Sequence, residues 1–294
     1  MVIHLWIRNS ENIFHINLHN NFILMIYVGS HINSYPQELL NNIKLMKLIN
    51  SNAIQIFVYP NKIGVKNIYN KVREYCQGNN IKIIVHASYT INIASGWNEH
   101  SSHLIQFISE IKMAEYIGAK YIIVHFGKYK QLELNEAYNN MYTFLIYVYS
   151  QIKDLKIKIL LETTSGQGTE LCYKIDTLAY FMNKILKHKN IELSNKFGIC
   201  VDTCHIYAAG YNILDYIDKF DELIGLEYID VIHFNDSKVS LGDRVDRHEN
   251  IGKGKIGSDD LYNFCKYALI MKCIIIMETP DVCEKVIDRI RKIK

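Results

Sequence analysis

The sequence predicts a single-domain (β/α)8 barrel, and two patterns carry that prediction. Eight short apolar runs rich in isoleucine and valine alternate with eight longer segments of helical periodicity. Continuous apolar runs are typical of parallel strands that are covered on both faces. Eight strand–helix pairs fit a closed barrel, whereas an open doubly wound sheet more often has about five or six strands.

The elements follow one another in strict alternation. The expected strands are residues 25–29, 53–58, 82–87, 120–126, 157–162, 197–202, 229–234 and 273–278. The expected helices are residues 36–50, 66–78, 98–117, 134–152, 174–188, 212–223, 258–271 and 281–293. The clearest helix, 98–117, repeats apolar residues at spacings of three and four and stops at Gly118. No low-complexity linker divides these units, so we expect one domain over residues 25–294.

Composition narrows the class of protein. The chain of 294 residues is 49% hydrophobic and 21% charged, and its net charge of +3 is too small to indicate nucleic-acid binding by itself. Seven cysteines without a C-x-x-C pair favour a reducing compartment, with most cysteines packed as small apolar residues. No apolar run approaches the length of a membrane span. Residues 1–24 lack the pattern of a secretory signal, so we expect an N-terminal extension of unknown role or a start assigned too early.

Polar residues stand where the apolar strands end. Seven of the eight expected strands end in, or run directly into, a residue that can bind metal, and only the second, which ends at Val58-Tyr-Pro60, does not. A single histidine in this position is more often a hydrogen-bonded structural residue than a ligand. The carboxyl ends of barrel strands meet at one rim, however, so seven such residues predict a common site. They are His31, His86, His125, Glu162, Asp202, His233 and Glu278.

Two local motifs add further candidate ligands. Asp202-Thr-Cys-His205 places an imidazole on the turn after a strand, and Asp246-Arg-His248 aims two ligand types to one side of an extended segment. Taken alone, the second motif is more often a solvated loop. Without His31, the rim residues and the two motifs give nine candidate ligands, which exceed the needs of one or two ions and suit three. They are His86, His125, Glu162, Asp202, His205, His233, Asp246, His248 and Glu278. Mixed imidazole and carboxylate donors favour zinc, with manganese as an alternative at some sites.

With these residues in view, the chain resembles the endonuclease IV family of apurinic/apyrimidinic endonucleases from about Tyr27 to Pro280. The long middle motifs are the most specific. The matching segments are Gly29–His31, His86–Tyr89, Val124–Gly127, Leu161–Gly168, Cys200–His205, Phe234–Lys238, Arg244–Gly252 and Met277–Pro280.

The resemblance implies three zinc ions and hydrolysis of the phosphodiester 5′ to an abasic site, leaving a 3′-hydroxyl and a 5′-deoxyribose phosphate. It places Glu162 and Glu278 in the catalytic centre, with Glu162 bridging two ions, and His31 in a supporting or DNA-facing position. It also allows 3′-diesterase or 3′–5′ exonuclease activity. The implied ligands are His86, His125 and Glu162 for the first zinc, Glu162, Asp202, His233 and Glu278 for the second, and His205, Asp246 and His248 for the third.

The same resemblance implies DNA contacts, and here the chain departs from the family pattern. Tyr89 matches an aromatic residue that enters the DNA, but Thr90 follows where an apolar wedge is expected. Lys62 lies in a loop where family members carry arginine and tryptophan, so it supplies charge without a planar stacking group. We expect phosphate contacts, or else only solvated loops, at Lys238, Arg244, Lys253 and Lys255.

Gly252 to Gly257 spells G-x-G-x-x-G, but it does not open a βαβ unit, so a nucleotide site is disfavoured. We expect this basic, glycine-rich loop to contact DNA phosphate through its side chains and backbone N–H groups, or to be a solvated loop.

Three other functions remain open from the sequence. A sugar isomerase or epimerase would use the same rim with one or two ions, a zinc enzyme could incise ultraviolet-damaged DNA, and a relic could bind DNA without cutting it. The expected partner is double-stranded DNA with abasic sites or blocked 3′ ends, with no membrane and a monomeric chain. We expect an intracellular location where DNA is repaired, in cytoplasm or nucleus, or a virion if the source is a large DNA virus.

Overall fold

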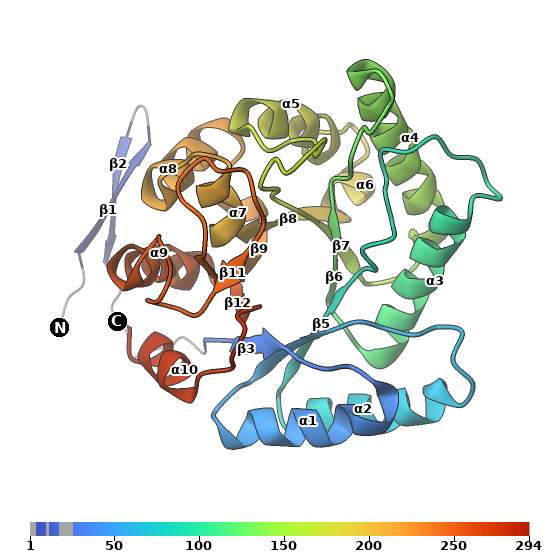
Figure 1. Cartoon of the computed structure of the whole chain (residues 1–294), viewed down its shortest axis with the longest axis horizontal. Helices are drawn as coiled ribbons and strands as arrows, with labels where there is room; N and C mark the ends of the chain where they lie inside the picture. Colours follow the sequence, from blue (N-terminus) through green and yellow to red (C-terminus); the bar gives the residue numbers. More distant parts are fainter. Residues whose placement is uncertain (1–3, 10–11, 18–25, 294) are drawn as a thin grey trace.

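Eight parallel strands close into a barrel surrounded by helices, which confirms the predicted fold class (Figure 1). The computed structural model describes residues 4–9, 12–17 and 26–293, with side chains described from residue 26 onward. The strands follow chain order around the barrel and close by pairing the last with the first. They are β3 (Val28–His31), β4 (Ala53–Ile56), β5 (Lys82–His86), β6 (Tyr121–His125), β7 (Lys158–Glu162), β8 (Phe197–Asp202), β9 (Ile229–His233) and β12 (Ile274–Met277).

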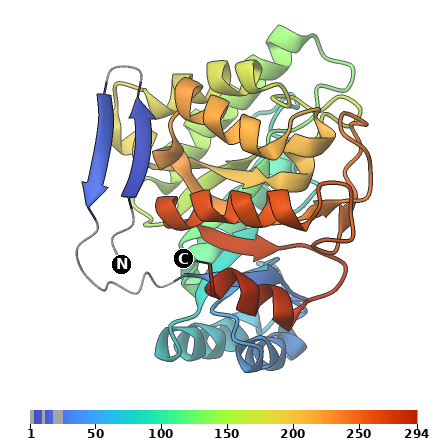
Figure 2. The same ribbon diagram turned by 90° about the vertical axis from the view of Figure 1, so that its left-hand side faces the viewer.

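Helices cover the outside of the barrel (Figures 1 and 2). The long ones follow the strands as the periodicity predicts, and their buried apolar stripes form the layer between barrel and helices. Two of them begin several residues later than predicted, at Ser102 instead of residue 98 and at Glu284 instead of residue 281. A second, smaller core of alternating strand residues fills the inside of the barrel. The helices are α1 (Pro36–Leu48), α2 (Val65–Gly78), α3 (Ser102–Ile117), α4 (Leu134–Ile152), α5 (Ile175–Leu186), α8 (Ile213–Leu223), α9 (Ser258–Met271) and α10 (Glu284–Arg291).

The first two strands differ from their predicted bounds. The first is predicted over 25–29, but β3 starts at Val28, and Met25 lies outside the described residues. The second is predicted over 53–58, but β4 ends at Ile56. After Ile56, backbone N–H groups bond to side chains and not to a neighbouring strand. The N–H of Phe57 donates to the Ser34 hydroxyl, and the N–H of Tyr59 donates to the Tyr69 hydroxyl. The segment after β4 therefore becomes a loop at the carboxyl rim.

Several short elements were not predicted. The antiparallel hairpin β1 (His4–Asn9) and β2 (Asn12–Asn17) lies in the predicted N-terminal extension, outside the ring of helices (Figures 1 and 2). The others lie between the predicted elements: α6 (Ile191–Asn195), α7 (Thr203–Ala208), the 3₁₀ helix η1 (Leu226–Tyr228), β10 (Asp236–Ser237) and β11 (His248–Glu249). Such elements are too short to show a clear periodicity.

Two further expectations concern the cysteines and the membrane. The described part of the chain has seven free cysteines, six of them buried, as their predicted packing role requires. In the same part of the chain, no helix combines the length and the apolar character needed to cross a bilayer.

Candidate metal centre

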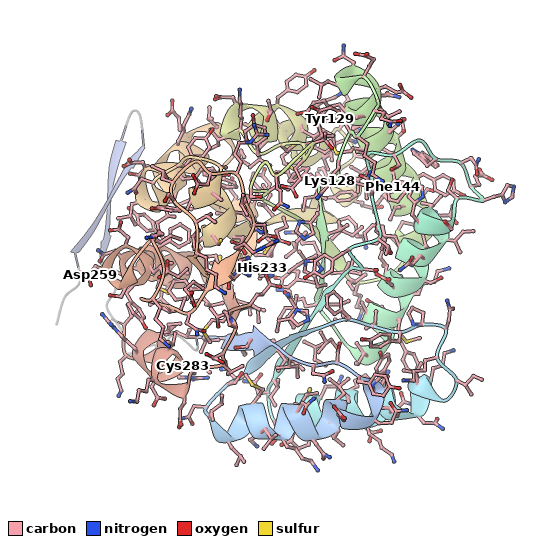
Figure 3. The ribbon with its side chains drawn as sticks, viewed as in Figure 1. Lys128, Tyr129, Phe144, His233, Asp259 and Cys283 are labelled. Atoms are coloured by element: carbon pink, nitrogen blue, oxygen red, sulfur yellow. The ribbon has the colours of Figure 1, made fainter. Side chains whose placement is uncertain are left out.

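The predicted ligands converge at the carboxyl ends of the barrel strands. Parallel pairing sets the terminal residues of adjacent strands side by side, so that His125 lies opposite Glu162, and Asp202 opposite His233. Figure 3 places His233 in the middle of the ring of helices. Four groups of donor atoms result, and Glu162 belongs to two of them.

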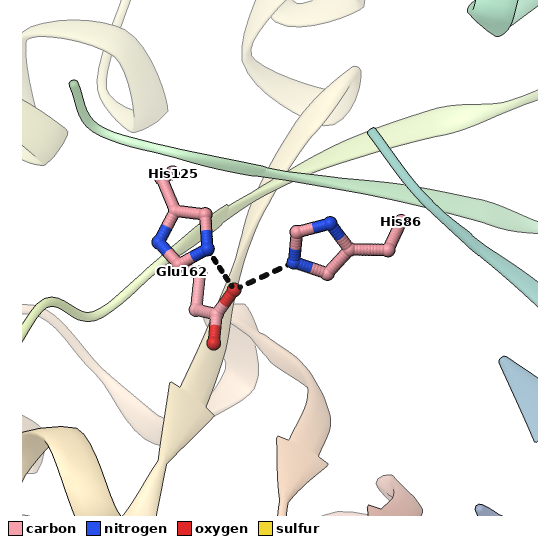
Figure 4. Close-up of side chains that lie close together, drawn as sticks. All are labelled: His86, His125 and Glu162. Atoms are coloured by element: carbon pink, nitrogen blue, oxygen red, sulfur yellow. Dashed lines mark hydrogen bonds and ion pairs between the residues drawn. The ribbon is translucent and has the colours of Figure 1, made fainter. Parts of the chain in front are cut away.

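The first cluster joins β5, β6 and β7. His86 Nε2 lies 3.1 Å and His125 Nε2 lies 3.5 Å from the same oxygen, Glu162 Oε2 (Figure 4). Two imidazole nitrogens and a carboxylate oxygen thus face one point. This is the set predicted for the first ion.

The second cluster uses the other oxygen of Glu162. His233 Nδ1 lies 2.8 Å from Glu162 Oε1, 3.2 Å from Glu278 Oε2 and 3.8 Å from Asp202 Oδ2. Because the two oxygens of Glu162 point to different clusters, this side chain is placed to bridge two ions. The set matches the one predicted for the second ion.

The third cluster lies toward the loops. His205 Nε2 is 3.1 Å and His248 Nε2 is 3.2 Å from Asp246 Oδ1, the three residues predicted for the third ion. The structure adds a neighbour that was assigned only to the second ion, because Asp202 Oδ2 lies 3.5 Å from His248 Nε2. Cys204 also lies within reach of Asp246 and His248.

Local structure explains how the loop ligands are held. Asp202 caps the N-terminus of α7 by accepting from the backbone N–H of His205 at 2.8 Å, so one carboxylate orients the next ligand. Asp246 is tied to the β7–α5 loop because its backbone N–H donates to Gln167 Oε1 at 2.9 Å. Arg244 Nε donates to the Gly166 carbonyl of that same loop. The segment that carries the third cluster is therefore fastened to the rim.

Four of the five histidines use one ring nitrogen for support and point the other at the carboxylates. This arrangement fixes tautomer and ring orientation, as is usual for metal ligands. The supporting bonds are His86 Nδ1 to the Ala87 carbonyl (2.7 Å), His205 Nδ1 to the Thr163 carbonyl (2.8 Å), His233 Nε2 to Gln55 Oε1 (2.7 Å) and His248 Nδ1 to the Glu278 carbonyl (3.2 Å).

Sequence reasoning missed two supporting side chains. Gln55 is fully buried in β4, where its amide nitrogen lies 2.6 Å from Glu278 Oε1 and 3.0 Å from His31 Nδ1. Asn235, also fully buried, donates to Asp202 Oδ2 at 2.7 Å and accepts from the backbone N–H of Glu278. A signal for Gln55 existed, since it is the one polar residue in the apolar run Ala53–Val58.

The electrostatics of the cluster favour charged carboxylates. Burial acts to raise the pKa of Glu162, but the charges of His233 and His125 outweigh it and hold that pKa well below its usual range. Burial likewise opposes protonation of His248, yet Asp202, Asp246 and Glu278 raise its pKa to about 9. The pKa values of His205 and His233 also lie well above their usual range, although burial acts to lower them.

The donor set fits bound cations. The Nε2 atoms of His205 and His248 are buried and lack a hydrogen-bond partner, although each lies at ion-pair distance from Asp246. Unpartnered buried polar atoms are costly, and converging carboxylates repel one another unless a positive charge stands between them. Imidazole nitrogens mixed with carboxylate oxygens are the donors that zinc and manganese accept.

Comparison with known proteins gives the family. Residues 43–293 match the family model described as a xylose isomerase-like TIM barrel. A protein named probable endonuclease 4 from Mycoplasmopsis pulmonis is 35% identical over 268 residues, which cover 87% of this chain and 94% of that protein. Another of that name, from Mycoplasmoides gallisepticum, is 40% identical over 202 residues, covering 67% of this chain and 64% of the relative. The chain belongs to the endonuclease IV family.

A solved structure supports the same membership. The crystal structure of endonuclease IV from Thermus thermophilus superposes with a TM-score of 0.69 at 25% identity and covers 87% of this chain and 93% of that one. The chain is thus a hydrolytic nuclease by family, and the resemblance seen in its motifs is confirmed.

A groove of about 820 Å³ opens beside the first cluster of this endonuclease IV relative. Tyr89, one of the predicted DNA contacts, lines it and is 69% exposed, with its ring 5.3 Å from that of His86 and 5.9 Å from that of His125. Lys62 lines the same groove, but its amine lies 3.5 Å from the centre of the Tyr35 ring. The ring of Tyr89 therefore lies where this groove meets the first cluster.

The other predicted DNA contacts lie on the loops. Lys238, Arg244 and Lys253 are all exposed. The Arg244 guanidinium also lies 4.5 Å from the centre of the Tyr173 ring, and its Nε bond to the Gly166 carbonyl helps to hold the loop of the third cluster. His31 lies 3.5 Å from Glu278 Oε1, beside a candidate ligand. One expectation is wrong, because the backbone N–H groups of residues 252–257 are not available to phosphate. Four of them donate to the buried carboxylate of Asp236, and the other two donate to backbone carbonyls.

Replacing Gln55 with alanine should weaken metal binding by roughly 10- to 100-fold, because His233 and Glu278 both lose a hydrogen-bond partner. Titration with a chelator of known affinity measures this change. Gln151→Ala, an exposed glutamine on α4, is the matched control and should bind metal as the wild type does. Equal affinity in Gln55→Ala and wild type would show that Gln55 only fills space.

Metal affinity should rise with pH up to about 9. A protonated imidazole cannot bind metal, and the raised pKa of His248, about 9, means that protons compete well above neutral pH. Chelator competition at pH 6, 7.5 and 9 should therefore give steadily tighter binding and release of protons on loading. An affinity that is flat from pH 7 to 9 is the contrary outcome.

Proposed function

We propose that this chain hydrolyses the phosphodiester on the 5′ side of an abasic site in double-stranded DNA, leaving a 3′-hydroxyl and a 5′-deoxyribose phosphate. Membership of the endonuclease IV family supports DNA as the substrate. The observation that carries the proposal is the bridging position of Glu162, whose two oxygens face two separate clusters with a third cluster alongside. A sugar isomerase has no use for the third cluster.

The proposed cofactor is zinc, three ions per chain, with manganese able to replace it at some sites. His86, His125 and Glu162 would hold the first ion, and Glu162, Asp202, His233 and Glu278 the second. His205, Asp246 and His248 would hold the third, with Asp202 close by. When bound, such ions offset phosphate charge and lower the pKa of water, so that hydroxide is available near neutral pH.

Side chains of the protein would position the attacking water. Glu278 is 11% exposed, whereas Glu162 and Asp202 are 1% and 0% exposed, so Glu278 is the most exposed carboxylate of the first two clusters. Gln55 and His31 fix its Oε1 atom. We propose that Glu278 orients the attacking water. No side chain is needed as a nucleophile.

Substrate binding would use the loops at the carboxyl rim. Tyr89 would enter the DNA beside the abasic sugar and shield the first cluster from bulk water, since its ring lies against those of His86 and His125. Lys62, Lys238, Arg244 and Lys253 would face phosphates, as basic side chains do in DNA complexes. Asp246 is 40% exposed, so the third cluster is open to a phosphate that arrives from solvent.

Several finer assignments belong to the same proposal. The site would also act as a 3′-diesterase, which removes blocking groups from 3′ ends, and as a 3′–5′ exonuclease. The chain would act as a monomer inside the cell, where DNA is repaired. Residues 1–24 would form an N-terminal extension to the barrel domain of residues 25–294.

The test is incision of a duplex that carries one abasic analogue. Wild type should nick it once and leave a 3′ end that a polymerase extends. Glu162→Gln keeps the shape of the side chain but removes the charge shared by two clusters, so incision should fall by more than about 100-fold. Glu133→Gln, an exposed residue at the start of α4, is the control and should retain full activity.

Full activity of Glu162→Gln would contradict the proposal. A wild-type enzyme that cuts an ultraviolet-irradiated duplex but not the abasic one would replace the substrate assignment. Turnover of a keto-sugar without any incision would favour the isomerase.

A further inference from the structure

The glycine-rich loop, residues 252–257, folds around a side chain of its own protein. Asp236 is fully buried, and its carboxylate accepts backbone N–H groups from four positions of the loop. Its Oδ2 atom accepts from Gly252 and Gly254, each at 3.0 Å, and its Oδ1 atom accepts from Ile256 at 3.0 Å and Gly257 at 3.4 Å. Such a ring of N–H donors is the kind of nest that binds anions.

The fit around this carboxylate is close. A Cβ atom on Gly254 would lie 2.5 Å from Asp236 Oδ1 and 2.5 Å from the Ser237 carbonyl oxygen, so only glycine allows the contact. Gly252 and Gly257 have φ angles of 78° and 89°, which also favour glycine. The G-x-G-x-x-G spacing is thus explained by an internal anion, and the donors that would bind a nucleotide phosphate are already in use.

The same residue is linked to the third cluster. Asp236 and Ser237 form β10, which pairs antiparallel with β11, and Ser237 lies opposite His248. The Lys238 N–H donates to the Arg247 carbonyl at 2.9 Å, and the Lys255 N–H donates to the Ser237 carbonyl at 2.7 Å. The loop, β10 and β11 therefore form one hydrogen-bonded unit, with Asp236 at its centre and His248 at its edge.

We infer that Asp236 is a positioning residue: by binding the loop as an internal anion, it fixes β10 and β11 and so places His248 in the third metal cluster. Hydrogen bonds to a charged acceptor are about twice as strong as neutral ones, so the carboxylate is the main tie in this unit. If an amide replaced the carboxylate, two loop N–H groups would face an NH₂ group, which cannot accept their hydrogen bonds, and β11 would lose its fixed position. The inference rests on the proposed three-ion centre.

Asp236→Asn tests it in the full-length, zinc-loaded protein. The amide has the same shape but turns an NH₂ group toward backbone N–H donors. After equilibration with chelator-buffered zinc, elemental analysis should find one ion fewer per chain than in wild type, with the missing ion bound about 10- to 100-fold more weakly. The kcat for abasic DNA should fall while KM changes less than about twofold, and added zinc should restore kcat.

Three further variants locate the effect. Asp243→Asn, an exposed aspartate that accepts one N–H from Ser240, is the matched control and should keep every ion. Gly254→Ala disturbs the same nest from the loop side and should lose the same ion, which keeps the test decisive if Asp236→Asn does not fold. His248→Ala should also lose the ion of the third cluster. The double variant that combines His248→Ala with Asp236→Asn should lose only this one ion.

Wild-type zinc content in folded Asp236→Asn or Gly254→Ala, or loss of all ions at once, overturns the inference. Failure of zinc to restore kcat in Asp236→Asn does the same. The zinc count is read without DNA, so a wild-type protein that binds three ions but does not cut abasic DNA would contradict the proposed function and leave the positioning role intact.

Discussion

The buried carboxylate of Glu162 is the constraint on which the rest of the site depends. It is 1% exposed and lies within 3.5 Å of ring nitrogens from four histidines, His86, His125, His205 and His233. A buried carboxylate is tolerated only when positive charge and hydrogen bonds surround it. Every ligand-bearing strand must therefore end at the same level, and a closed parallel barrel is a fold that achieves this for residues far apart in the chain.

The burial of Glu162 also bears on which candidate ligands lie on strands and which lie on loops. The first two clusters are built almost wholly from strand ends, where backbone pairing sets the direction of each side chain. The third depends on α7, the loop around Asp246 and the short strand β11, which need ties of their own. Gln167 and Arg244 supply two of these ties, and the role we propose for Asp236 supplies a third.

Much of the fold and of the candidate metal site could be predicted from the sequence alone. Apolar strand runs that end in histidine, aspartate or glutamate predict both the barrel and its rim, because alternation and topology leave few other arrangements. The sequence does not predict features that depend on contacts between residues far apart in the chain. The end of β4 depends on the hydroxyls of Ser34 and Tyr69, and the support from Gln55 depends on which face of β4 meets His233. Asp202 lies close to His248 of the third cluster as well as to the second cluster, and no spacing in the sequence reveals that distance.

The number of metal ions per chain tests the central claim most directly. Elemental analysis of the purified protein, after removal of loosely bound metal, should find three ions, with zinc as the main metal. That count requires all nine donors to act as the structure arranges them around Glu162. A count of one, unchanged when Asp246 and His248 are both replaced with alanine, would mean that the loop residues bind no ion and would contradict the account.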